Sequence, residues 1–178
     1  HTVECDLPAG GGSGGSCEEV TSGACSATNL TQFGSRASDA SRICNKESGG
    51  TPILSRSDVC CGNDSTCSNP KSFSGGYFQI NILSEADKIP GCSAGFYERN
   101  GANSIQGDCV KRSTKVFQKS GLGVCLGWSC EITDQSMYLT CLKATTDRDV
   151  NFSAAKELFD ARGFQPWEVS AGRCDVSF

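Results

Sequence analysis

The chain has 178 residues, 13 cysteines, a single histidine and a formal net charge of −4 at pH 7. Binding to nucleic acid needs clustered lysines and arginines, so this mildly acidic composition argues against a nucleic-acid partner. With only one histidine to share metal binding, metal sites are a poor explanation for so many cysteines, and disulfide bonds are a better one. We therefore expect a secreted, extracellular protein with no metal and no cofactor.

The length fits one domain that spans residues 1–178. Within it we expect an N-terminal extension over residues 1–26, in which the Gly/Ser-rich stretch 10–16 is pinned by Cys5 on one side and by Cys17 and Cys25 on the other. No apolar run is long enough to cross a bilayer, so no membrane association is expected. We expect His1 to be a mature N-terminus left by processing, and the protein to be a monomer.

The first predicted helix covers about 35–48 and carries an acidic residue on its apolar stripe. Glu47 follows Ile43 and Cys44 at helical spacing, and Gly49 and the later Pro52 end the helix. A carboxyl group held against apolar surface loses hydration of its charged form, which raises its pKa toward the range useful for a general acid. Glu47 is therefore a candidate catalytic acid. The alternative is a glutamate that bends out to water.

After this helix the spacing of the apolar residues changes from helical to alternating, because residues 74–83 alternate between apolar and polar side chains. This alternation predicts one β-strand with an apolar and a polar face. The polar face carries Tyr77, Gln79 and Asn81.

Later segments are predicted to be helical, over 109–119, 130–144 and 151–163. Asn151 or Ser153 is expected to cap the last of these helices, Gly163 to end it, and the following Phe-Gln-Pro-Trp to fold back onto the body. Helices beside a small sheet make the fold class α+β. The N-x-Ser/Thr sequences at Asn29, Asn63 and Asn151 are expected glycosylation acceptors if the source is eukaryotic.

A helix that ends in Glu-Ser-Gly-Gly, then a polar loop, then Gly-Tyr-Phe-Gln-Ile-Asn resembles the lysozyme and lytic transglycosylase superfamily. The segment 151–167 is similar to the closing helix and Trp-containing turn of secreted bacterial-type members. The resemblance runs from about residue 35 to the last residue. It implies a lysozyme-like core over residues 27–178 that is mostly helical, with a small antiparallel sheet beside a catalytic cleft. It also implies a muramidase acting on the β-1,4 linkages of peptidoglycan glycan strands.

By this resemblance Glu47 is the general acid, and Ser74, Tyr77, Gln79 and Asn81 contact the substrate. Hydrogen bonds that tether loops are the alternative role for Gln79 and Asn81.

The second carboxylate departs from the animal-type pattern, because Ser74 stands where those lysozymes have an aspartate. Asp58 and Asp64 are the candidates to replace it. We prefer Asp58, which lies beside the pair Cys60 and Cys61, although either aspartate can instead serve only to cap the loop.

Three other readings stay open. A lytic transglycosylase needs only one glutamate when the 6-hydroxyl of the substrate attacks. A lysozyme-fold protein that binds glycans without cleaving them is the second, and a disulfide-rich toxin or inhibitor is the third.

Overall fold

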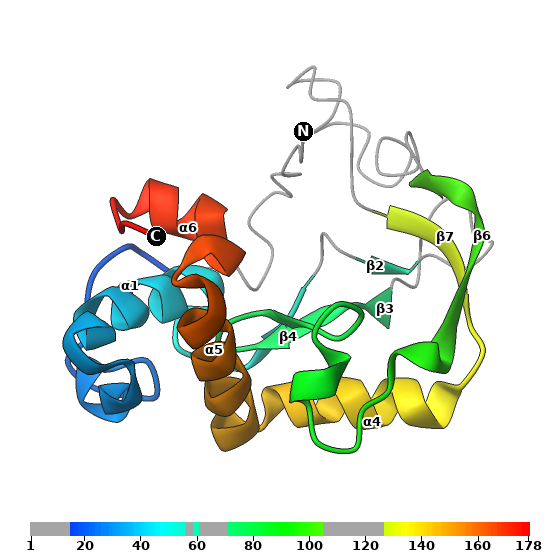
Figure 1. Cartoon of the computed structure of the whole chain (residues 1–178), viewed down its shortest axis with the longest axis horizontal. Coiled ribbons are helices and arrows are strands. Elements are labelled where there is room, and N and C mark those ends of the chain that lie inside the picture. Colours follow the sequence, from blue (N-terminus) through cyan, green and yellow to red (C-terminus); the bar gives the residue numbers. More distant parts are fainter. Residues whose placement is uncertain (1–14, 56–58, 61–70, 105–126) are drawn as a thin grey trace.

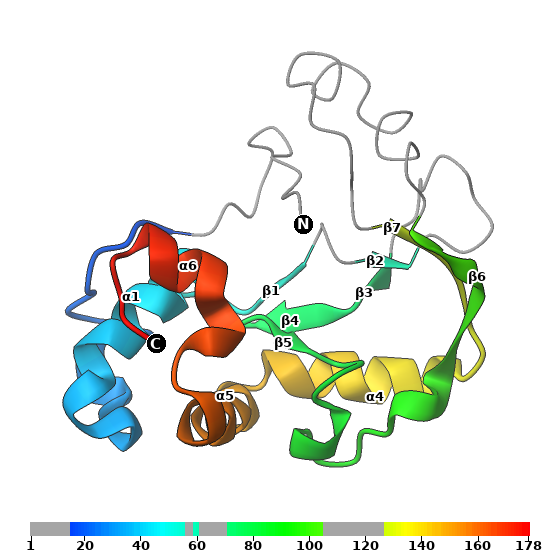
Figure 2. The same cartoon turned by 45° about the horizontal axis from the view of Figure 1, so that its top comes forward.

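A computed structural model describes residues 15–55, 59–60, 71–104 and 127–178 of the chain. These residues form an α+β structure, as predicted, with two small sheets. Helices α1, α5 and α6 lie together at one end, and strands β2, β3, β6 and β7 lie at the other (Figures 1 and 2). Helix α4 extends from the α5 side beneath β4 toward the second group (Figure 2).

Helix α1 spans Ala37–Ser48 and confirms the first predicted helix. Two 3₁₀ turns precede it, η1 over Ala27–Asn29 and η2 over Thr31–Arg36. The predicted stripe is buried at Ala40, Ile43 and Cys44. Gly49 adopts the left-handed conformation at the C-cap, with φ 64°, which a glycine reaches without the steric cost of a side chain.

The first sheet contains β1 (Ile53–Leu54), β4 (Ser74–Gly76) and β5 (Ile80–Asn81), all antiparallel in the order β1-β4-β5. The prediction of a single strand over 74–83 is therefore wrong, because β4 and β5 form a hairpin. Gly76 (φ 86°) and Gln79 (φ 50°) turn the chain between them. Burial still alternates across the turn, so the period-2 pattern of the sequence does not reveal it.

The second sheet is mixed. It contains β2 (Val59–Cys60), β3 (Lys71–Ser72), β6 (Tyr97–Ser104) and β7 (Gly127–Ile132) in the order β3-β2-β7-β6. Strands β2 and β7 are parallel, so the expectation of antiparallel pairing holds fully only for the first sheet. Two further 3₁₀ turns, η3 (Ala86–Lys88) and η4 (Ala94–Phe96), lie between the sheets in sequence.

The predicted helix over 130–144 is wrong at its start. Cys130 belongs to strand β7, and helix α4 spans Gln135–Thr146. The side chain of Asp134 accepts a hydrogen bond from the Met137 N–H and so caps α4, a start signal that the helical spacing alone does not show. The predicted helix over 109–119 lies outside the described residues.

Helix α5 spans Arg148–Arg162 and ends at Gly163, as predicted. Its predicted caps are wrong, because Asp147 accepts from the N–H groups of Asp149 and Val150, and the helix begins before Asn151. The turn η5 (Gln165–Trp167) and the short helix α6 (Glu168–Arg173) follow. Phe164 and Trp167 are buried, which confirms the predicted return of this segment onto the body.

The aromatic core is centred on Phe78, at the tip of the β4–β5 hairpin. Its ring centroid lies 5.6 Å from Phe33, 5.7 Å from Phe152 and 5.5 Å from Trp167. These rings come from η2, α5 and η5. The tip of the hairpin is therefore packed at the junction of these helices.

Four disulfides join described residues: Cys17–Cys174, Cys25–Cys44, Cys60–Cys130 and Cys92–Cys141. They support the prediction of a disulfide-rich fold, and Cys17 and Cys25 pin the end of the N-terminal extension; Cys5 lies outside the described residues. Over the same ranges, no helix has the length and apolar character needed to span a bilayer.

Candidate functional site

Glu47 lies in the last turn of α1, as predicted, and its side chain is half-buried. The Ser170 hydroxyl donates a hydrogen bond to Glu47 Oε1 at 2.6 Å. Ser170 belongs to α6 and is only 7% exposed. The carboxylate is therefore anchored to a second helix and does not simply bend out to water.

Helix α6 is itself held in place by bonds to the body. The disulfide Cys17–Cys174 ties its C-cap residue to the end of the N-terminal extension. The Arg42 guanidinium on α1 donates to the carbonyl oxygen of Cys174. The hydroxyl that contacts Glu47 is thus carried by a fixed support.

Hydrogen bonds also connect the segments next to Glu47, namely the residues before α6 and strand β1, to the β4–β5 hairpin. Trp167, just before α6, donates from Nε1 to the carbonyl oxygen of Phe78 at 2.8 Å. Gln79 donates from Nε2 to the carbonyl oxygen of Ile53 at 2.9 Å, and Ile53 begins the strand that follows the C-cap of α1. A continuous series of contacts therefore links Glu47 to α6 through Ser170, α6 to the hairpin through Trp167, and the hairpin to β1 through Gln79.

The polar side chains of the hairpin are largely engaged by the protein. Gln79 Nε2 also donates to the carbonyl oxygen of Gly76 at 2.8 Å. Asn81 Oδ1 accepts from the N–H groups of Leu83 and Ser84, and its Nδ2 donates to Ser74 Oγ at 3.3 Å. These contacts match the loop-tethering alternative. Sugar binding by Ser74, Gln79 and Asn81 stays a prediction.

A pocket of about 280 Å³ lies between β5 and the segment that leads into α6. Gln79 and Asn81 line it together with Trp167 and Glu168, and Glu47 is not among its lining residues. Tyr77 faces elsewhere, with its ring 5.4 Å from that of Phe152 in an edge-to-face arrangement. The structure thus brings Gln79 and Asn81 to one pocket and separates Tyr77 from it.

Asn151 is a structural centre that the sequence did not identify as one. It is 1% exposed, accepts from the Phe78 N–H at 2.9 Å, and donates to the carbonyl oxygens of Gly75 and Thr145 at 3.1 and 2.9 Å. A Cβ on Gly76 would lie 2.1 Å from both Asn151 Nδ2 and the Thr145 carbonyl oxygen. The glycines of the hairpin are therefore required by the close approach of the α4–α5 junction.

The burial of Asn151 also corrects the glycosylation prediction at this position. Its amide is enclosed and fully hydrogen-bonded in the folded chain, so it is not available as an acceptor. Asn29 is exposed on η1. Asn63 lies outside the described residues, as do both candidates for the second carboxylate, Asp58 and Asp64.

No family model matches the chain, and neither a curated protein nor a solved structure matches it.

Proposed function

We propose that this protein is a secreted muramidase that hydrolyses the β-1,4 linkage between N-acetylmuramic acid and N-acetylglucosamine in bacterial peptidoglycan, with Glu47 as general acid. The observation that carries the proposal is the anchored carboxylate at the end of α1, whose Oε1 accepts from Ser170 at 2.6 Å. A carboxylate placed by a partner on another helix has the defined orientation that proton transfer to a leaving oxygen requires.

The hairpin gives the second support. Its Gly-Tyr-Phe-Gln-Ile-Asn sequence resembles the corresponding lysozyme strand, and its tip is tied through Trp167 Nε1 to the segment that precedes Ser170. In this proposal Asp58 supplies the second carboxylate, as a base or as an electrostatic partner of the oxocarbenium-like transition state. Replacing Asp58 by Asn should then lower the rate roughly 100-fold or more, while the same change at Asp64 should have little effect.

Replacing Glu47 by Gln tests the main assignment. The amide is nearly isosteric and still accepts from Ser170, but it cannot donate the catalytic proton, so cleavage of a peptidoglycan suspension should be lost. The matched control is Glu131→Gln, a change at an exposed glutamate on β7 that should leave cleavage intact. A Glu47→Gln protein that folds normally and still cleaves would remove Glu47 from the mechanism.

The second candidate is a lytic transglycosylase, and one observation favours it. Ser74 occupies the strand position of the animal-type aspartate; the residue is 8% exposed, and its hydroxyl accepts from Asn81. Mass analysis of the released fragments separates the two reactions: reducing ends identify a hydrolase, and anhydro ends identify a transglycosylase.

A further inference from the structure

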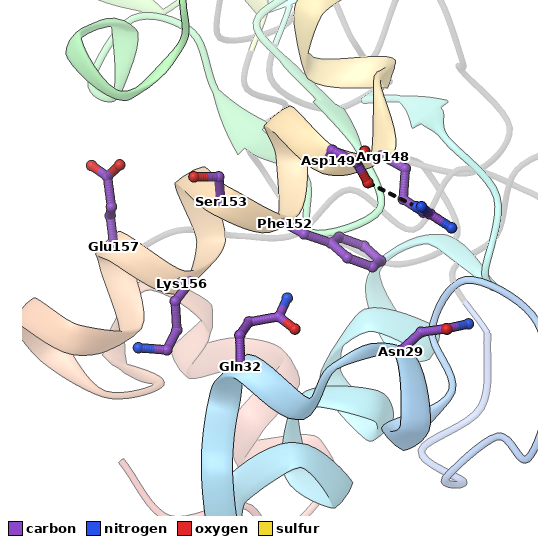
Figure 3. A pocket seen from close by; sticks show the side chains of 8 residues that line it. All are labelled: Asn29, Gln32, Arg148, Asp149, Phe152, Ser153, Lys156 and Glu157. Carbon is purple, nitrogen blue, oxygen red and sulfur yellow. Dashed lines mark hydrogen bonds and ion pairs between the residues drawn. The ribbon is translucent and has the colours of Figure 1, made fainter.

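A second pocket lies between the 3₁₀ turns η1 and η2 and the first half of α5, and Glu47 does not line it. Its volume is about 420 Å³, which falls in the range of about 300–1,000 Å³ typical of small-molecule sites. None of the hairpin residues predicted to bind substrate lines it either. Figure 3 shows the Gln32 amide directed toward the Phe152 ring in this pocket. The pocket is therefore separate from the proposed cleavage site.

The charged side chains that line this pocket are mostly paired. Arg148 Nε lies 3.0 Å from Asp149 Oδ1 (Figure 3), and Lys156 forms an ion pair with Asp160 one helical turn later. An anionic ligand such as a phosphate requires cations that are free to contact it. The pairing therefore disfavours a phosphate or a polyanion in this pocket.

Three lining side chains are free to bind a ligand. Within the described residues, the Gln32 amide, the Ser153 hydroxyl and the Glu157 carboxylate have no side-chain hydrogen bond or ion pair. Together they offer a donor and an acceptor amide, a hydroxyl, and an acceptor-only carboxylate. An apolar ligand would leave these groups unpaired, which costs free energy, whereas the hydroxyl groups of a sugar can pair with all three.

The floor of the pocket is apolar and rigid. Phe152 lines it and is only 6% exposed, because its ring packs edge-to-face against Tyr77 at 5.4 Å and Phe78 at 5.7 Å. A small apolar floor beside a free amide, a hydroxyl and a carboxylate matches the chemistry of a pyranose, which has C–H groups on its faces and hydroxyls at its edge. We propose that this pocket is a second glycan-binding site, for a short neutral oligosaccharide.

The proposal is independent of cleavage at Glu47 and is tested by binding. The ¹⁵N-labelled wild-type full chain is titrated with N,N′-diacetylchitobiose and followed by NMR, in which any cleavage is visible as new sugar signals. We expect saturable shifts at the Gln32 side-chain amide and at the backbone amides of Ser153 and Glu157. Gln32→Ala should weaken this binding roughly 2- to 10-fold, as expected for the loss of one hydrogen bond. The matched control is Gln135→Ala, at an exposed glutamine on α4.

Three outcomes would overturn the glycan site: no saturable shift at these residues, unchanged affinity in Gln32→Ala, or equal shifts with inorganic phosphate in place of the disaccharide. The first of these outcomes, with shifts confined to the surroundings of Glu47 and Gln79, would leave the muramidase proposal intact. Conversely, binding in this pocket together with an active Glu47→Gln protein would leave the glycan site intact and remove the muramidase assignment.

Discussion

Replacing Ser170 by Ala removes the hydroxyl that donates to Glu47 Oε1 at 2.6 Å. A hydrogen bond to a charged group contributes roughly 1.5–3 kcal/mol to the free energy of unfolding. Ser170 is buried, but Glu47 is half-buried and water can replace part of the contact, so the lower end of that range applies. We expect the free energy of unfolding to fall by about 1.5 kcal/mol in urea titrations.

If Glu47 is the general acid, as proposed, the same change should also lower the catalytic rate, because it removes the hydrogen bond that orients the carboxyl group. If the whole free energy of the lost hydrogen bond is added to the activation barrier, each loss of about 1.4 kcal/mol lowers the rate tenfold. We expect kcat for peptidoglycan cleavage to fall about tenfold with KM unchanged, after the rate is normalised to the folded fraction. Ser170→Thr keeps the hydroxyl and should recover most of the rate, and Ser136→Ala, at an exposed serine of α4, is the matched control.

A Ser170→Ala protein with full kcat, in a chain that Glu47→Gln inactivates, would show that Ser170 does not position the acid. Unchanged stability as well would show that the hydrogen bond contributes nothing in solution. The stability measurement needs no substrate, so it tests the contact even if the enzymatic assignment fails.

Two further predictions concern stability. Asn151→Ala should lower the free energy of unfolding by about 3 kcal/mol or more, because it leaves a buried N–H and two buried carbonyl groups without this partner. Urea titration measures this loss, and Asn29→Ala, at an exposed asparagine, should cost far less; similar losses in both variants would contradict the role given to Asn151. For Tyr138, burial raises the pKa to about 12, from 10.0, and its hydroxyl donates to the Ser72 carbonyl oxygen at 3.1 Å. Between those two values the unfolded chain has lost the phenol proton while the folded chain keeps it, so stability falls as the pH rises from 10 to 12. The advantage of the wild type over Tyr138→Phe should therefore shrink over this interval by up to about 3 kcal/mol, and a constant difference between the two proteins would refute the buried phenol.

The long helices were predictable because their signals are local. The stripe of α1 and the closing glycines Gly49 and Gly163 lie within a few residues of the elements they define. The hairpin was not predictable in the same way. Phe78 is buried because helices enclose the turn, and a buried residue at that position continues the alternation of a strand. The pattern therefore had no break where the chain reverses.

The candidate site also has a part that local sequence predicts and a part that it does not. The position of Glu47 at the end of an amphipathic helix follows from its neighbours in sequence. Its partner Ser170 is 123 residues away, and Asn151 binds the Phe78 N–H across 73 residues. A serine in a short C-terminal helix, or an asparagine inside a longer one, has no local feature that identifies its distant partner. Such contacts are set by tertiary packing, which the period of a single segment does not contain.

The disulfide Cys17–Cys174 encloses almost all of the described chain, and the other three bonds described here lie inside it. If a peptidase cuts the backbone once at any point between these two cysteines, the fragments stay joined by a covalent bond. Such a nicked molecule runs at its full mass in gel electrophoresis without reductant and separates only after reduction. Because the bond also holds the helix that carries Ser170, a nicked molecule keeps the support of Glu47 attached. In surroundings rich in peptidases, a first cut is therefore not enough to release the segment that anchors the Glu47 carboxylate.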